Sequence, residues 1–209
     1  IYPVPKTLKT ELLDEMLSRT EVRSVIVFTR TKHGADRLAR QLQRLGHAVA
    51  ALHGNRSQSQ RERALSDLKR GRVQIMVATD IASRGIDVEG ITHVINYDVP
   101  HTPEDYVHRI GRTGRVEAVG DAFTLMSPDE MKQVAQIERF LGRTIPRVML
   151  PDFNYKMRPM ELKRAVTAQP ERYRPSHRGA PARNAHAPSA GRPRNGVSGA
   201  QPRSTQSRS

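Results

Sequence analysis

Apolar residues between positions 6 and 150 follow two patterns that alternate along the chain. Short runs rich in β-branched residues predict strands, and stretches with apolar residues three or four positions apart, such as Leu38, Leu42 and Leu45, predict helices. Gly46 and Gly71 stand where two of these helices should end. The predicted strands are 24–28, 48–52, 74–78, 93–97 and 121–126, and the predicted helices are 7–19, 32–45, 57–70, 103–110 and 128–141.

The predicted strands 24–28 and 74–78 are apolar without alternation, as strands covered on both faces are. Strands that alternate with helices form mainly parallel sheets. We therefore expect an α/β fold, a doubly wound, mainly parallel sheet with helices on both faces. Ligands of such sheets bind at the carboxyl ends of the strands, so the loops after Phe28, Leu52, Ala78 and Tyr97 are the first candidates for a site.

Charge is distributed unevenly over the 209 residues, which carry a formal net charge of +14. Segment 156–209 holds 12 Lys or Arg against two Glu, and the first 155 residues carry only about +4. From position 163 onward there is no Leu, Ile, Phe or Met, so this tail cannot bury a core and is expected to be disordered. A basic tail of this kind attracts nucleic acid or anionic lipid, or simply keeps the chain soluble.

Other compositional features exclude several classes. The absence of Cys excludes disulfides and thiolate metal sites, and we expect no metal ligands in this chain. No apolar run approaches the length of a membrane helix, and the start lacks the pattern of a signal peptide. We therefore expect a cytoplasmic protein. Because the chain starts at Ile1 and not at Met, we also expect it to be a fragment of a longer protein.

Arginines and glycines alternate in the segment 108–115, at the end of a predicted helix. Arg109, Arg112 and Arg115 are interleaved with Gly111 and Gly114. Glycine lets a ligand approach the backbone, and guanidinium groups match phosphate oxygens. Arginines that only complement the helix dipole are the simpler alternative, but the spacing of the glycines favours an anion site.

Three further loops carry candidate residues. In segment 78–87, Asp87 can accept hydrogen bonds from a ribose and Thr79 can donate to a phosphate, although Thr79 or Asp80 can also cap the short helix 81–83. Segment 53–61 combines Gly54 with two arginines at a helix start, where Ser57 is an ordinary cap candidate. Segment 29–32 is basic and polar, and is also compatible with a plain loop.

Taken in order, the four segments resemble the DEAD-box RNA helicases, specifically the second of their two RecA-like domains. Segment 25–30 looks like motif IV, Gln58 to Arg61 like the Gln-x-x-Arg element, 78–87 like motif V, and 108–115 like motif VI. The resemblance covers roughly residues 1–150, and a bacterial RhlE-type helicase is the nearest subtype. It implies four parts: the end of an interdomain linker at 1–6, the RecA-like domain at 7–150, a short extension at 151–165 and the disordered basic tail at 166–209.

The resemblance also implies residue roles. Arg112 and Arg115 would be arginine fingers that stabilise charge on the γ-phosphoryl group of ATP, with Mg²⁺ as its companion ion. His108 and Arg109 would contact the partner domain and count with the fingers as catalytic residues, while Gly85 and Asp87 would border the nucleotide. The RNA backbone would be held by Arg30, Thr31, Lys32, Gly54, Gln58, Arg61 and Thr79.

Neither a Gly-x-x-x-x-Gly-Lys-[Ser/Thr] phosphate loop nor an Asp-Glu-Ala-Asp stretch occurs in the chain. The expected partners are therefore RNA and an N-terminal RecA-like domain preceding Ile1 that holds the phosphates and Mg²⁺, and the chain alone is expected to be inactive. Ribonucleoprotein or RNA-decay partners fit the resemblance, and a membrane does not. A related DNA helicase domain and a non-enzymatic RNA-binding module acting through its tail remain the alternatives.

Overall fold

A computed structural model describes residues 1–19, 24–83, 90–113 and 120–155 of the chain. It contains every predicted strand and helix. The predicted helices 7–19 and 128–141 each begin with a short 3-10 helix, and the other ends are shifted by at most two residues. The strands are β1 (Tyr2–Pro3), β2 (Val25–Phe28), β3 (Val49–Leu52), β4 (Ile75–Ala78), β5 (His93–Asn96) and β6 (Asp121–Met126). The helices are η1 (Lys6–Leu8), α1 (Lys9–Arg19), α2 (Lys32–Arg44), α3 (Gln58–Lys69), α4 (Asp80–Ser83), α5 (Pro103–Ile110), η2 (Pro128–Glu130) and α6 (Met131–Leu141).

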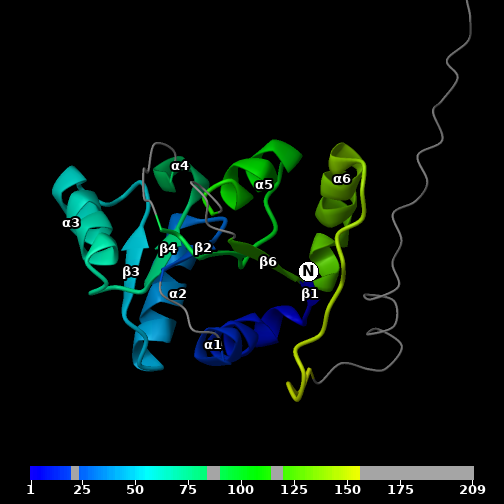
Figure 1. Ribbon diagram of the computed structural model, residues 1–209, viewed down its shortest axis with the longest axis horizontal. Helices are drawn as coiled ribbons and strands as arrows, with labels where there is room; N and C mark the ends of the chain where they lie inside the picture. Colours follow the sequence, from blue (N-terminus) through cyan, green and yellow to red (C-terminus); the bar gives the residue numbers. More distant parts are fainter. Residues whose placement is uncertain (20–23, 84–89, 114–119, 156–209) are drawn as a thin grey trace, which may run out of the picture. The chain divides into compact units, whose positions relative to one another are not determined.

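The strands form one parallel sheet in the order β1-β6-β5-β2-β4-β3. Strand β2 lies at its centre, where Val27 is opposite Val77 of β4 and Ile95 of β5. Helices α1 and α2 cover one face of the sheet, and α3, α5 and α6 cover the other (Figure 1). This arrangement confirms the predicted doubly wound α/β fold.

The two faces have separate apolar cores because side chains alternate along each strand. Val25 and Val27 point toward α1 and α2, while Ile26 and Phe28 point toward α3. All four side chains are buried, which explains why this strand has no polar position in its sequence. The central strand is thereby fixed in register, and the loop that follows Phe28 is held at the carboxyl edge of the sheet.

Residues 1–6, expected at the end of a linker, instead contribute a strand to the sheet. Tyr2 and Pro3 pair with Leu125 and Met126 of β6, and the amide of Val4 donates to the carbonyl of Met126 at 2.9 Å. The side chain of Val4 is completely buried. Strand β1 is an edge strand, where a proline is tolerated because its missing N–H interrupts no ladder between two neighbours.

The helix ends follow the polar residues and glycines of the sequence. Thr31 accepts a hydrogen bond from the amide of Gly34 at the start of α2, and Ser57 and Gln60 form a reciprocal capping box at the start of α3. Gly46 and Gly71 have φ angles of +96° and +69°, a region that residues with a Cβ rarely adopt. The predicted helix ends at these glycines are confirmed.

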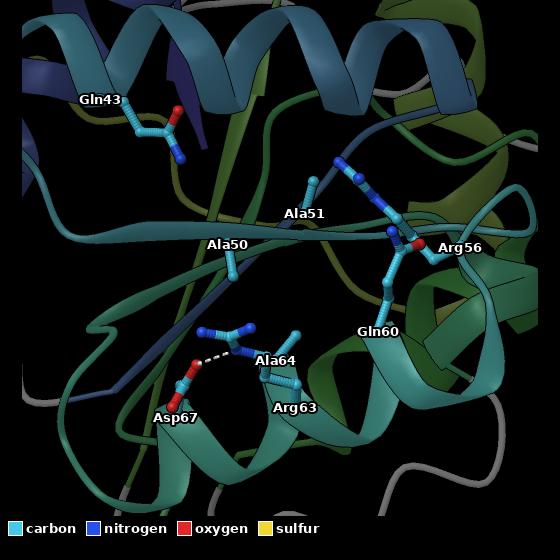
Figure 2. A pocket seen from close by; sticks show the side chains of 8 residues that line it. All are labelled: Gln43, Ala50, Ala51, Arg56, Gln60, Arg63, Ala64 and Asp67. Atoms are coloured by element: carbon cyan, nitrogen blue, oxygen red, sulfur yellow. Dashed lines mark ion pairs between the residues drawn. The ribbon is translucent and has the colours of Figure 1, made fainter.

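Strand β3 forms the other edge of the sheet, between α2 and α3. The side-chain amide of Gln43 on α2 donates to the outward-facing carbonyl of Val49 at 2.8 Å. Beside it lies a hollow of about 250 Å³, bordered by Ala50 and Ala51 of β3 and by Arg63 and other residues of α3 (Figure 2). This hollow runs along the edge of the sheet and reaches the loop after β3, where Arg56 lines it.

The segment after α6 returns across the domain. The amide of Leu150 donates to the hydroxyl of Tyr155 at 2.7 Å, and the ring of Tyr155 packs edge-on against Phe153. Tyr155 is buried against the core on the α1 side of the sheet, so the described part of the predicted extension, residues 151–155, packs on the domain. Among the described residues, no helix is long and apolar enough to cross a membrane.

Candidate functional site

Arg109 of α5 lies at the centre of the candidate site. Its Nε and Nη2 donate to the two carboxylate oxygens of Asp80 at 2.6 and 2.8 Å, and its Nη1 donates to Asn96 Oδ1 at 3.1 Å and to the carbonyl of Asp98 at 2.8 Å. The guanidinium also lies 5.0 Å from the centre of the Phe28 ring, within cation–π range. Arg109 therefore joins α5 to the carboxyl ends of β2, β4 and β5.

This environment differs from the expectation that Arg109 faces a partner domain. Its side chain is only 2% exposed, and its N–H groups already donate to the carboxylate of Asp80, to Asn96 Oδ1 and to the carbonyl of Asp98. His108, one position earlier, is exposed on the surface of α5. The structure thus separates two neighbours with the same expected role into a buried residue and an accessible one.

Arg112 lies in the turn after α5. The backbone amide of Arg112 donates to the carbonyl of Arg109, and Thr113 Oγ1 donates to the carbonyls of Ile91 and Thr92 at 2.9 and 3.2 Å. These contacts anchor the turn to the segment just before β5. Arg115 lies outside the described residues, as do Gly85 and Asp87, so the expected nucleotide contacts are represented here by Arg112 alone.

Thr79 is buried where β4 meets α4. Its amide donates to the carbonyl of Leu52 at 3.2 Å, and its carbonyl accepts from the amide of Ala82 at 3.1 Å, which closes the first turn of α4. The next residues, which belong to the helix, are Asp80, which holds Arg109, and Ile81, whose apolar side chain is 80% exposed. Thr79 therefore has a structural role at the start of α4.

The loop after β2 is fixed at both ends. The amide of Arg30 donates to Asp98 Oδ2 at 2.8 Å, and its guanidinium donates to the carbonyl of Val99 and to Glu130 Oε1, each at 3.3 Å. Thr31 caps α2. The next residue, Lys32, is exposed, and its Nζ donates to Asn55 Oδ1 at 3.1 Å. Lys32 thereby connects this loop to the loop after β3.

Glu130 is a buried carboxylate that supports the Arg30 loop. Its Oε2 accepts from Lys9 Nζ at 2.6 Å and from the amide and hydroxyl of Ser127, and its Oε1 accepts from the amide of Val99 and from Arg30. Lys9 is equally buried and also donates to the carbonyl of Tyr97 at 2.7 Å. Buried charges need such partners, because their hydration is lost on folding.

The loop after β3 is held by a second charged group. His53 Nε2 lies 2.9 Å from Asp36 Oδ1, and Arg56 Nη2 donates to the same oxygen at 2.8 Å. Burial by itself would raise the pKa of Asp36, but the hydrogen bond and charge of His53, together with Arg56 and Arg40, outweigh burial and lower this pKa. The Asp36 carboxylate is thus stabilised where α2 meets the loop.

The three residues expected to hold RNA in this loop and at the start of α3 have different surroundings. Gly54 is exposed, and a Cβ built on it would meet nothing within 4 Å. Gln58 is exposed and donates to Glu62 at 2.8 Å, while Arg61 donates to the carbonyl of Ala82 at 3.2 Å. Arg61 therefore links α3 to α4, and Gly54 and Gln58 present an open surface.

The structure brings the expected RNA-contacting residues of three loops to the carboxyl edge of one sheet. Sequence reasoning missed the residues that hold them in place: Asp98 and Glu130 for Arg30, and Asn96 for Arg109. The only signal for Glu130 was its position three residues after Ser127, the spacing of a capping box. In the described part of the chain, no group of three or more His, Asp or Glu side chains could hold a metal ion.

Comparisons with known proteins agree with this geometry. The helicase conserved C-terminal domain family matches residues 8–117. The DEAD-box ATP-dependent RNA helicase CshA of Geobacillus kaustophilus is 44% identical over 143 residues, which are 68% of this chain and 31% of that protein. The chain therefore spans less than a third of the length of this relative.

Solved structures show the same similarity. The Escherichia coli DEAD-box protein SrmB, solved bound to the regulator of ribonuclease activity A, superposes with a TM-score of 0.72 at 34% identity, over 75% of this chain and 93% of that chain. Dbp5 of Saccharomyces cerevisiae, solved bound to RNA and ADP BeF3, has a TM-score of 0.66 at 30% identity, over 80% of this chain and 44% of that chain.

Proposed function

The chain belongs to the helicase conserved C-terminal domain family and resembles DEAD-box RNA helicases, and from this membership we propose that it is the C-terminal half of an ATP-dependent RNA helicase. In this role it supplies arginine fingers and part of the RNA-binding surface for RNA-stimulated ATP hydrolysis and local duplex unwinding. The observation that carries the proposal is the convergence of the loops after β2, β3 and β4 on one edge of the sheet, with α5 tied to the same edge through Arg109.

ATP would bind between this domain and an N-terminal RecA-like domain that holds its phosphates and Mg²⁺. From this side, Arg112 and Arg115 would contact the γ-phosphoryl group, and Gly85 and Asp87 would border the nucleotide. Fixed guanidinium groups stabilise charge that develops during phosphoryl transfer. The anchor of Thr113 to Ile91 and Thr92 supports this role, because it fixes the backbone next to Arg112.

RNA would lie across the loops at the carboxyl ends of β2, β3 and β4. Arg30, Thr31, Lys32, Gly54, Gln58, Arg61 and Thr79 would contact its phosphates and sugars, as such exposed amides, hydroxyls and cations commonly do. Contacts of this type carry little sequence information, so the proposed RNA preference is broad. Arg61 is half-buried and Thr79 is buried, so the exposed members of the set, Arg30, Thr31, Lys32, Gly54 and Gln58, are proposed as the first points of contact.

Arg109 acts as a positioning residue in this proposal. It holds α5, the helix that precedes Arg112, against α4. His108 and Ile81 are exposed on these helices and would meet the N-terminal domain when ATP and RNA close the two domains. Closure would bend the bound RNA strand away from its complement, and hydrolysis would reopen the cleft.

The test is the RNA-stimulated ATPase of the full-length enzyme with Arg112→Ala. Turnover should fall by about a thousandfold or more, as for other missing arginine fingers, while RNA affinity stays within a few-fold of that of the unsubstituted enzyme. Lys69→Ala, an exposed position on the opposite side of the sheet from α2, serves as the control. Retention of normal turnover by Arg112→Ala would disprove the finger assignment.

The remaining finer assignments extend the same proposal. The chain without an N-terminal domain is proposed to be inactive as an ATPase, since fingers need a bound triphosphate to act on. The tail 156–209, with its net charge of +10, is proposed to tether RNA in a salt-dependent manner. A bacterial RhlE-type helicase acting in the cytoplasm is the proposed subtype, because the core is compact and the tail short.

A further inference from the structure

Helix α2 carries a row of basic side chains on its outer surface. His33, Arg37, Arg40 and Arg44 follow one another at intervals of four, three and four residues, which places them on one face of an α-helix. All four are exposed. The buried residues of α2, Ala35, Leu38, Ala39 and Leu42, occupy the opposite face, so this basic stripe points directly away from the sheet.

Charge on this face is only partly balanced by acidic side chains, since the charge of Arg40 acts on the Asp36 carboxylate without forming an ion pair. Among the described residues, none of the four side chains makes a hydrogen bond or an ion pair. The one carboxylate of α2, Asp36, is engaged by His53 and Arg56. Like charges three and four residues apart destabilise a helix, and only Arg44 lies near enough to the carboxyl end to complement the helix dipole. The helix dipole therefore does not account for Arg37 or Arg40.

The stripe is continuous with the proposed RNA site. Helix α2 begins at Lys32, directly after Thr31, and Lys32 already joins the loops after β2 and β3. From there the stripe extends for about 16 Å down the outside of the domain, given a rise of about 1.5 Å per residue. A polyanion that contacts Lys32 can thus continue along α2 without a break in positive charge.

We propose that the stripe of Arg37, Arg40 and Arg44 binds the phosphate backbone of RNA that extends beyond the strand held at the carboxyl edge of the sheet. This inference rests on the proposed function and adds a second RNA-contacting surface to it. Unpaired, exposed guanidinium groups in a row suit a polyanion with evenly spaced charges, and phosphate contacts of this kind are independent of sequence. The stripe would therefore increase affinity for long RNA and leave short RNA unaffected.

The experiment compares two variants of the 209-residue chain with equal loss of charge. One is Arg37→Gln/Arg40→Gln/Arg44→Gln, and the other is Lys69→Gln/Arg70→Gln/Arg72→Gln, which changes exposed residues at the end of α3 on the opposite face of the sheet. Glutamine keeps helix propensity close to that of arginine, and thermal unfolding checks that both variants fold. Affinity is measured by fluorescence anisotropy over a range of salt, with labelled RNAs of about 6 and about 20 nucleotides.

The α2 variant should bind the long RNA about tenfold or more weakly near 0.1 M salt, and its log–log salt slope should be smaller by about 2 to 3. Binding of the short RNA and all binding by the α3 variant should change little. Equal losses in the two variants, or no loss in the α2 variant, would overturn the inference. So would a loss of binding to phosphatidylserine vesicles with unchanged RNA binding, which would assign the stripe to a membrane surface.

A third variant separates this inference from the proposed function. Gln58→Ala changes the first residue of α3, next to the loop after β3, and should weaken binding of both RNAs. If Gln58→Ala weakens binding and the α2 variant does not, the stripe proposal alone fails. If neither variant changes binding of either RNA, the proposed RNA surface at the carboxyl edge of the sheet fails as well.

Discussion

Arg109 and Asp80 form a bidentate ion pair that joins two helices 29 residues apart in the sequence. Asp80 begins α4, two residues after the end of β4, and Arg109 belongs to the last turn of α5. The pair fixes the segment that leads to Gly85 and Asp87 relative to the segment that leads to Arg112. The proposed function requires such a link between the two segments, since small errors of position weaken electrostatic stabilisation.

Replacement of Arg109 by alanine should destabilise the domain by about 3 to 5 kcal/mol. The change removes the bidentate ion pair with Asp80 and the donor shared by Asn96 and the carbonyl of Asp98. Urea denaturation followed by circular dichroism measures the loss. The neighbouring His108→Ala, at an exposed position of the same helix, is the control and should change stability by less than about 0.5 kcal/mol. Similar small effects for both variants would contradict the role given to Arg109.

Lys9 and Glu130 should show strong energetic coupling. Glu130→Gln removes the carboxylate that pairs with buried Lys9, and Lys9→Met leaves Glu130 with Arg30 as its remaining counter-ion. Each change should destabilise the domain by several kcal/mol, about 3 to 5 for a fully buried pair. The double variant contains neither charge and should lose less than the sum of the two. A double-mutant cycle should give a coupling energy of about 1 to 3 kcal/mol, and additivity within about 0.5 kcal/mol would refute the pairing.

The contribution of Asp36 should depend on pH in a defined direction. Its pKa is lower in the folded chain than the ordinary value of 3.8, so its charge stabilises the fold above that value, and this stabilisation is lost as the pH falls through the lowered pKa. Asp36→Asn should therefore be less stable than the natural chain at neutral pH, and the difference should narrow in acid. Chemical denaturation at a series of pH values tests this, and a difference that stays constant into acid would argue against it.

Gly54 and Gly46 should respond to alanine in opposite ways. At Gly54 the added Cβ meets no atom of the chain, so Gly54→Ala should retain its stability within about 0.5 kcal/mol and lose RNA affinity several-fold if RNA approaches the backbone there. At Gly46, where φ is +96°, alanine should cost about 1 kcal/mol or more without affecting RNA binding. Unfolding curves and RNA titrations of the two variants provide the comparison. Unchanged RNA affinity in Gly54→Ala would remove this glycine from the proposed site.

Local patterns were sufficient to predict most of the fold. Strand β2 is a run of buried apolar residues, and α2 has Leu38 and Leu42 on one face and a glycine at its end, so each element is recognisable from a few consecutive positions. Strand β1 was not predictable in this way. It has only two residues, one of them proline, and is a strand only because β6, more than a hundred residues later, pairs with it.

The candidate site shows the same division between local and long-range information. Its loops were predictable, since polar and glycine residues follow each buried strand. The environments of individual side chains were not: His108 and Arg109 are adjacent in a motif, yet one is exposed and the other is buried. Likewise, nothing near Lys9 in the sequence indicates that its partner is Glu130, because the fold alone brings α1 and η2 together.

The hydrogen bond from Gln43 to Val49 has a consequence for self-association. An edge strand presents unpaired carbonyls and amides to which a strand of another molecule can add, and β3 is such an edge. In this chain a side chain of the neighbouring helix occupies one of those acceptors, so an incoming strand would have to displace it before the first intermolecular hydrogen bond at that residue could form. Gln43 thus disfavours the addition of a strand from another molecule at this edge of the sheet.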